Sequence, residues 1–139
     1  MANFKIAFRK TCKWEGEYAN DPDDAGGETY KGISRKHHPT WNGWKIIDKL
    51  KQEHPRGFKT KLKGNSELQA MVDDFYKRNY WNHLHLDDLA NQELANQIFD
   101  TAVNCGIKPA VKIIQKVLGI PADGKLGPVT IEAMKKIKG

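Results

Sequence analysis

The chain has 139 residues, 39% of them hydrophobic, which is enough for one folded domain with its own core. Its mean hydropathy of −0.69 and the lack of a long apolar run exclude a membrane-spanning helix. A net charge of +6 indicates an anionic partner, either nucleic acid, a membrane surface or bacterial cell wall, and a solvated surface without a partner is the alternative. The first ten residues lack the apolar run of a secretory signal, so we expect synthesis in the cytoplasm without a signal peptide.

The first apolar pattern predicts a helix over about residues 3–16. Phe4, Phe8, Cys12 and Glu15 recur at helical spacing on one face. Turn residues dominate from residue 17 to residue 43, with a short strand pair expected around residues 29–33.

Cys12 and Cys105 lie in apolar helical contexts and are expected to be buried free thiols.

The rest of the chain is predicted to be helical. Ser66 followed by Gln69 has the spacing of a capping box that opens a long helix. The expected helices span about residues 44–53, 66–81, 91–104, 108–118 and 128–137, with a polar connection at 55–65. We therefore expect an all-α chain with a small irregular or β lobe near the N-terminus.

Three polar residues near the start of the chain could support hydrolysis of a glycosidic bond. This reaction needs a proton donor kept neutral and a polar group that holds or activates water. Glu15 ends an apolar stripe, where desolvation raises a carboxyl pKa, whereas Asp24 lies in a glycine-rich turn and Thr29 follows it. In the alternative without a catalytic role, Glu15 is solvated and Asp24 forms hydrogen bonds with local backbone groups. Four further acids leave the second carboxylate open: Glu17, Asp21, Asp23 and Glu28.

The run from Glu15 to Ile33 resembles the Glu-Gly-Gly-Tyr signature of the family 108 glycoside hydrolases. These are N-acetylmuramidases, some of them labelled secretion activators or phage endolysins. Residues 98–106, Gln115 and residues 123–130 are similar to the predicted peptidoglycan-binding segment that accompanies the signature. Glu17 departs from the family pattern, because glycine usually stands at this position.

The resemblance implies a lysozyme-like fold and cleavage of the β-1,4 bond between N-acetylmuramic acid and N-acetylglucosamine. It implies Glu15 as the essential acid, and the order Glu15, Asp24, Thr29 also resembles the triad of phage-type lysozymes, which favours inversion. Residues 1–90 would form the hydrolase region and residues 91–139 the peptidoglycan-binding region of the same globule. We expect a monomer that needs no cofactor and acts on peptidoglycan strands after release to the wall. A non-catalytic module that binds cell wall or assists secretion is the alternative.

Other side chains are candidates for binding. Tyr18 and Tyr30 flank the acids and are expected to contact substrate. By resemblance Asn104 lines the glycan groove, with a local capping role as the alternative. No metal site is expected, because His83 and His85 would face opposite ways on a helix. Nucleic acid is not expected either, since the glycine-rich turn at residues 121–127 is too long for a helix-turn-helix.

Overall fold

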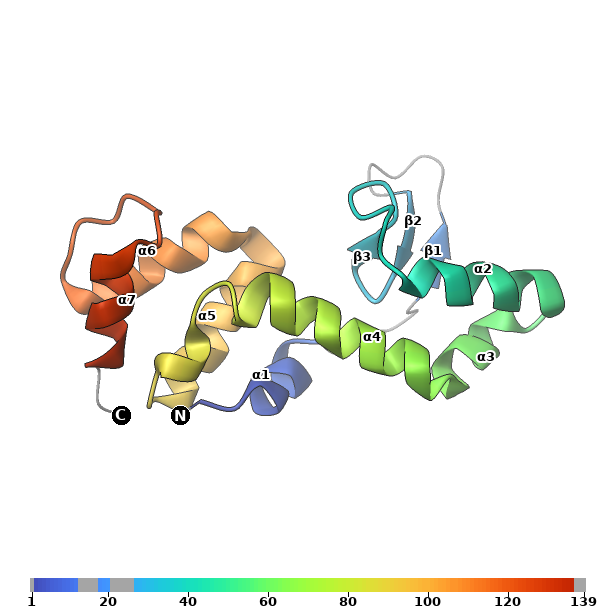
Figure 1. Ribbon diagram of the computed structural model, residues 1–139, viewed down its shortest axis with the longest axis horizontal. Helices are drawn as coiled ribbons and strands as arrows, with labels where there is room; N and C mark the ends of the chain where they lie inside the picture. Colours follow the sequence, from blue (N-terminus) through green and yellow to red (C-terminus); the bar gives the residue numbers. More distant parts are fainter. Residues whose placement is uncertain (1, 13–17, 21–26, 137–139) are drawn as a thin grey trace. The chain divides into compact units, whose positions relative to one another are not determined.

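The computed structural model describes residues 2–12, 18–20 and 27–136, which belong to two compact units (Figure 1). Unit 1 contains the chain up to residue 13 and residues 75–139. Unit 2 contains residues 14–74.

Unit 2 contains a three-stranded antiparallel sheet and the helices that cover it. Its strands β1 (Tyr18–Asn20), β2 (Glu28–Tyr30) and β3 (Ile33–Ser34) lie in the order β1-β2-β3. Lys31 and Gly32, with φ of 47° and 81°, form the tight turn between β2 and β3. The helices are α2 (Gly43–Glu53), α3 (Phe58–Gly64) and the start of α4 (Ser66–Tyr76).

The core of unit 2 lies under one face of this sheet. Figure 1 shows α2 beside the strands and α3 following it. The buried hydrophobic side chains among the described residues of this unit are Tyr30, Ile33, Trp44, Ile47, Leu62, Leu68 and Val72. Trp44 and Ile47 of α2, and Leu68 and Val72 of α4, lie at helical spacing, and α3 adds Leu62 to the same core.

Unit 1 is a helical assembly around aromatic side chains. Trp81 is fully buried, its ring centroid lies 5.7 Å from that of Phe4 and 6.0 Å from that of Phe99, and its indole N–H donates to Asp87 at 2.7 Å. The α-helices of this unit, beyond the end of α4, are α1 (Phe4–Thr11), α5 (Gln92–Cys105), α6 (Ile107–Leu118) and α7 (Pro128–Lys135). A π-helical turn (Lys77–Trp81) extends α4, and a 3₁₀ turn covers Leu86–Asp88.

The structure confirms the predicted fold class, which is mainly α with a small sheet near the N-terminus. The first helix ends earlier than expected, at Thr11, and residues 13–16 of the predicted helix lie outside the described residues. The polar connection expected at 55–65 is wrong, because residues 58–64 form α3. One fully buried side chain, Leu62, fixes this seven-residue helix, so its sequence carries almost no apolar period.

Two further expectations need correction. The cap of α4 is Asn65, whose side-chain oxygen accepts from the Leu68 N–H at 2.9 Å, while Gln69 bonds to residues distant in the sequence. Cys105 is exposed at the last residue of α5, and Cys12 is half-buried, so neither is the fully buried thiol we expected, although neither forms a disulfide. The expected region 91–139 lies inside unit 1, and its peptidoglycan-binding role stays a prediction.

Trp81 should carry a large share of the stability of unit 1. Trp81→Ala removes a fully buried side chain and is expected to lower the free energy of unfolding by about 3–5 kcal/mol. Urea unfolding followed by circular dichroism measures this change. Val129→Ala is the control, since Val129 is 74% exposed, and equal effects of the two substitutions would contradict the packing described.

Candidate functional site

The predicted site residues fall into three groups. Glu15 and Asp24 lie outside the described residues, as do Glu17, Asp21 and Asp23. Tyr18, Thr29 and Tyr30 lie on neighbouring strands of the sheet in unit 2. Asn104 lies in α5 of unit 1. The sheet therefore holds three of the predicted site residues that the structure describes.

The sheet has two chemically different faces. Side chains alternate along a strand and paired residues share a face, so Thr29 and its partner Ala19 point away from Glu28 and Tyr30. Tyr18 pairs with Tyr30 and shares the face of Glu28. Thr29 is half-buried and Ala19 is exposed. The hydroxyl of Thr29 thus belongs to the face opposite the one that packs on the helices.

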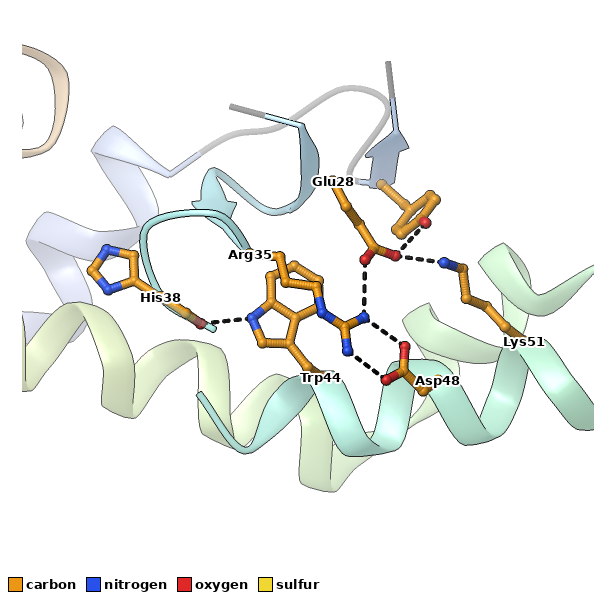
Figure 2. Close-up of polar contacts among 7 residues, drawn as sticks. Glu28, Arg35, His38, Trp44, Asp48 and Lys51 are labelled. Atoms are coloured by element: carbon orange, nitrogen blue, oxygen red, sulfur yellow. Dashed lines mark hydrogen bonds and ion pairs between the residues drawn. The ribbon is translucent and has the colours of Figure 1, made fainter. Parts of the chain in front are cut away.

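Glu28 lies at the centre of a polar cluster formed by Tyr18, Glu28, Arg35, Asp48 and Lys51, which we call the Glu28 cluster (Figure 2). Its Oε2 atom accepts from the Tyr18 hydroxyl at 2.5 Å and from Lys51 Nζ at 2.5 Å. Its Oε1 atom accepts from Arg35 Nη1 at 3.0 Å. The carboxylate side chain is only 11% exposed, so these donors replace most of its water.

Arg35 connects Glu28 to helix α2. Its two terminal nitrogens each donate to one oxygen of Asp48 at 2.7 Å, the bidentate geometry that makes such pairs strong. Figure 2 shows its guanidinium beside Trp44, with 5.3 Å between the Cζ atom and the ring centroid. The indole of Trp44 donates in turn to the carbonyl of His38 at 2.9 Å. The cluster therefore joins the sheet to α2 through both charge and ring contacts.

The cluster keeps Glu28 ionised at neutral pH. Burial pushes the pKa of Glu28 upward, but hydrogen bonds from Lys51, Tyr18 and Arg35 outweigh it, so the pKa lies below its ordinary value. Burial lowers the pKa of Lys51, but its contacts with Glu28 and Tyr18 together raise it by more, so the pKa lies above its ordinary value. The bidentate bond from Arg35 lowers the pKa of Asp48 against the smaller effect of its burial.

This geometry removes Glu28 from the acids left open by the sequence. The second carboxylate must accept a hydrogen bond or a proton from water, but the Glu28 carboxylate already accepts from three donors, and its lowered pKa makes it a weaker base. Sequence reasoning missed its structural role, because the partners Arg35 and Lys51 are separated from it by 7 and 23 positions and share no periodic pattern.

The two tyrosines expected to contact substrate differ in exposure. Tyr30 is 1% exposed and its hydroxyl accepts from Gln69 Nε2 at 2.9 Å, so its ring packs inside unit 2. Tyr18 is half-buried, and its ring packs edge-on against Phe58 with 5.1 Å between centroids. Substrate binding by either tyrosine stays a prediction, and the burial of Tyr30 does not favour it.

Asn104 takes part in a local contact at the end of α5. Its amide nitrogen donates to the carbonyl of Asp100 at 2.9 Å and to the carboxylate of Asp100 at 3.3 Å. The side chain remains exposed. Asn104 therefore makes the kind of local contact that the sequence offered as an alternative. Its role in a glycan groove stays a prediction.

The C-terminal part of unit 1 contains a loop built around Gln115. The Gln115 side chain, 2% exposed, donates to Asp123 Oδ1 at 2.8 Å and to the Lys125 carbonyl at 3.0 Å, and accepts from the Gly124 N–H at 2.9 Å. Beside it lies an open hollow of about 360 Å³. Its lining includes Gln115, Ile120, Pro121, Pro128, Val129 and Thr130. This hollow lies within the expected peptidoglycan-binding region.

Residues 2–12, 18–20 and 27–136 contain no group of three His, Cys, Asp or Glu side chains that could hold a metal ion. Within the same residues, every helix is too short or too polar to cross a bilayer.

The chain is similar to one protein family and to a solved structure. The family described as Glycosyl hydrolase 108 matches residues 8–106, a range that includes the Glu15–Ile33 run. Among solved structures the chain is similar to SagA of Brucella abortus, with 31% sequence identity and a TM-score of 0.56. That match covers 97% of this chain and 70% of the other. No curated protein matches the chain.

The Glu28 cluster should make stability depend on pH. Because the pKa of Glu28 is lower in the folded protein than its ordinary value of 4.5, its stabilisation is present above that pH and is lost as the pH falls through the folded pKa. Glu28→Gln should cost about 2 kcal/mol of unfolding free energy at neutral pH, the scale of a hydrogen bond to a charged group.

Urea unfolding at pH values from about 3 to 7 measures this difference, which should shrink toward the acid end. Glu53→Gln is the matched control, because Glu53 is an exposed acid of α2 that pairs with Lys49 at 3.9 Å. A difference between wild type and Glu28→Gln that does not change with pH would contradict the charged cluster.

Proposed function

The chain belongs to the glycosyl hydrolase 108 family, and on that premise we propose that it is an N-acetylmuramidase of the lysozyme type. Its substrate is the β-1,4 bond between N-acetylmuramic acid and N-acetylglucosamine in peptidoglycan. The observation that carries this proposal is the family match over residues 8–106, because it includes every proposed catalytic residue. The similarity to SagA over 97% of the chain supports the same assignment to the family.

Glu15 is the proposed general acid. It follows helix α1, which ends at Thr11, by four residues in the sequence. This role requires that its carboxyl group lose part of its hydration, because desolvation favours the neutral form. A neutral carboxyl can protonate the glycosidic oxygen as the bond to the leaving sugar breaks.

Asp24 and Thr29 are proposed to act on the attacking water. Asp24 accepts a proton from the water while the oxygen attacks the sugar, and the Thr29 hydroxyl orients that water by a hydrogen bond. The described geometry supports Thr29 as available, because its side chain belongs to the sheet face opposite the Glu28 cluster. Glu28 itself is engaged by three donors, which leaves Asp24 as the better candidate for the base.

The charge of the protein suits its proposed substrate. A net charge of +6 draws the protein toward an anionic surface and raises its rate of encounter with it. Peptidoglycan and its attached polymers carry carboxylates and phosphates. We propose that the protein acts on the cell wall after its release from the cytoplasm, as a monomer that needs no cofactor or metal.

Glu15→Gln should abolish digestion of purified peptidoglycan without unfolding the protein. Loss of a general acid costs about 10²–10⁴-fold in rate, and glutamine keeps the size of the side chain. The assay measures new reducing ends at muramic acid, with circular dichroism as the check on folding. Glu17→Gln is the matched control two residues away, and it should retain most of the rate.

Other outcomes of this digestion assay would indicate a different acid, a different bond or a non-catalytic function. Retained turnover by Glu15→Gln removes Glu15 as the acid. New free amino groups in place of reducing ends indicate amide cleavage. A wild-type protein that sediments with peptidoglycan but leaves it intact is a binding module, the non-catalytic alternative for this chain.

The reaction should invert the configuration at the cleaved sugar. If Asp24 activates water on the face opposite the leaving group, the first product of β-bond cleavage is the α-anomer. Proton NMR of a soluble glycan fragment during the first minutes of reaction distinguishes the anomers before they equilibrate. The β-anomer as first product would require a covalent intermediate and would overturn the role given to Asp24.

A further inference from the structure

We propose that Glu28 is a positioning residue: its hydrogen bonds on one face of β2 fix the direction in which Thr29 presents its hydroxyl on the opposite face. This inference rests on the proposed function, in which Thr29 orients water. It assigns to Glu28 a role that differs from those of the acid and the base, because Glu28 acts on the reaction only through the backbone it shares with Thr29.

The sheet around Thr29 is short. Strand β2 has three residues, and three residue pairs join it to β1 while two join it to the two-residue strand β3. Gly27 precedes the strand with φ of 63°, and the tight turn at Lys31 follows it directly. Strands this short define their register weakly, and a shift by one residue moves every side chain to the other face. Side-chain contacts are therefore needed to hold Thr29 in place.

Glu28 supplies these contacts from three directions. Its carboxylate accepts from Tyr18 of β1, from Arg35 just after β3 and from Lys51 of α2. Arg35 also donates its backbone N–H to the Glu28 carbonyl at 2.9 Å, so side chain and main chain of Glu28 bind the same residue. Sliding or rotation of β2 would break charged hydrogen bonds to a carboxylate that has little access to water.

A second anchor lies on the other side of Thr29. The buried hydroxyl of Tyr30 accepts from Gln69 of α4, on the same sheet face as Glu28. Gln69 is itself held by the Leu62 carbonyl at 2.9 Å. Both chain neighbours of Thr29 are thus fixed to the helices, which leaves Thr29 as the one residue of β2 that points the other way.

The decisive test is a double-mutant cycle between Glu28 and Thr29. Glu28→Gln should lower kcat on peptidoglycan by about tenfold with little change in KM, because a small misplacement of a positioned group is enough for such a loss. In the Thr29→Ala background, Glu28→Gln should cause almost no further loss. A purely structural Glu28 predicts the opposite, namely equal losses of kcat in the two backgrounds.

Two further variants, one that perturbs Glu28 by another route and one control, complete the cycle. Lys51→Met removes another donor of the same carboxylate and should show the same dependence on Thr29, even if Glu28→Gln fails to fold. Glu53→Gln, the exposed acid of α2, should leave kcat unchanged in both backgrounds. Equal losses in the two backgrounds for Lys51→Met, or full kcat in Thr29→Ala, would overturn the inference.

A second measurement does not depend on turnover. Three-bond couplings to the methyl carbon of Thr29 report its χ1 angle in solution, and wild type should show one rotamer. Glu28→Gln should show averaged couplings, whereas Glu53→Gln should match wild type. Identical couplings in all three proteins would refute positioning by Glu28. If wild type has the single rotamer but does not cleave peptidoglycan, the proposed function fails and the positioning stands.

Discussion

The three hydrogen bonds to the Glu28 carboxylate are the interaction on which the sheet of unit 2 depends. A carboxylate that is 11% exposed has lost most of its hydration, and only charged or strongly polar donors can compensate for that loss. Tyr18, Arg35 and Lys51 provide them from a neighbouring strand, a turn and a helix. Removing any one donor leaves a poorly solvated charge, so the three donors stabilise the sheet of unit 2 together.

The same interaction separates structure from chemistry along one strand. Glu28 and Tyr30 are bound to the helices, while Thr29 between them belongs to the opposite face. This alternation explains how one acid of an acid-rich segment, Glu28, can stabilise the fold while its neighbour Thr29 points to the other face. In the proposed reaction, the functional groups are Glu15, Asp24 and Thr29, and the membership of the chain in a glycosyl hydrolase family gives them a substrate class.

Sequence patterns predicted the elements whose apolar residues repeat, such as the helices that became α2 and α5, and the turn signals located the sheet. They failed where distant partners decide the outcome. The burial of Leu62 and the contact between Phe58 and Tyr18 position α3, and Gln69 bonds to Tyr30, 39 positions away, instead of completing a cap. The roles of Glu15 and Asp24 come from family resemblance, since neither spacing nor composition distinguishes a catalytic acid from one bound as Glu28 is.

A crystal structure of the Glu15→Gln variant with a bound peptidoglycan fragment would show where the substrate lies. We expect the sugar at the cleavage point to lie on the Thr29 face of the sheet. It also predicts that Glu28 still accepts from Tyr18, Arg35 and Lys51 in the complex. A glycan bound against Glu28, or a complex in which Thr29 lies far from the scissile bond, would contradict it.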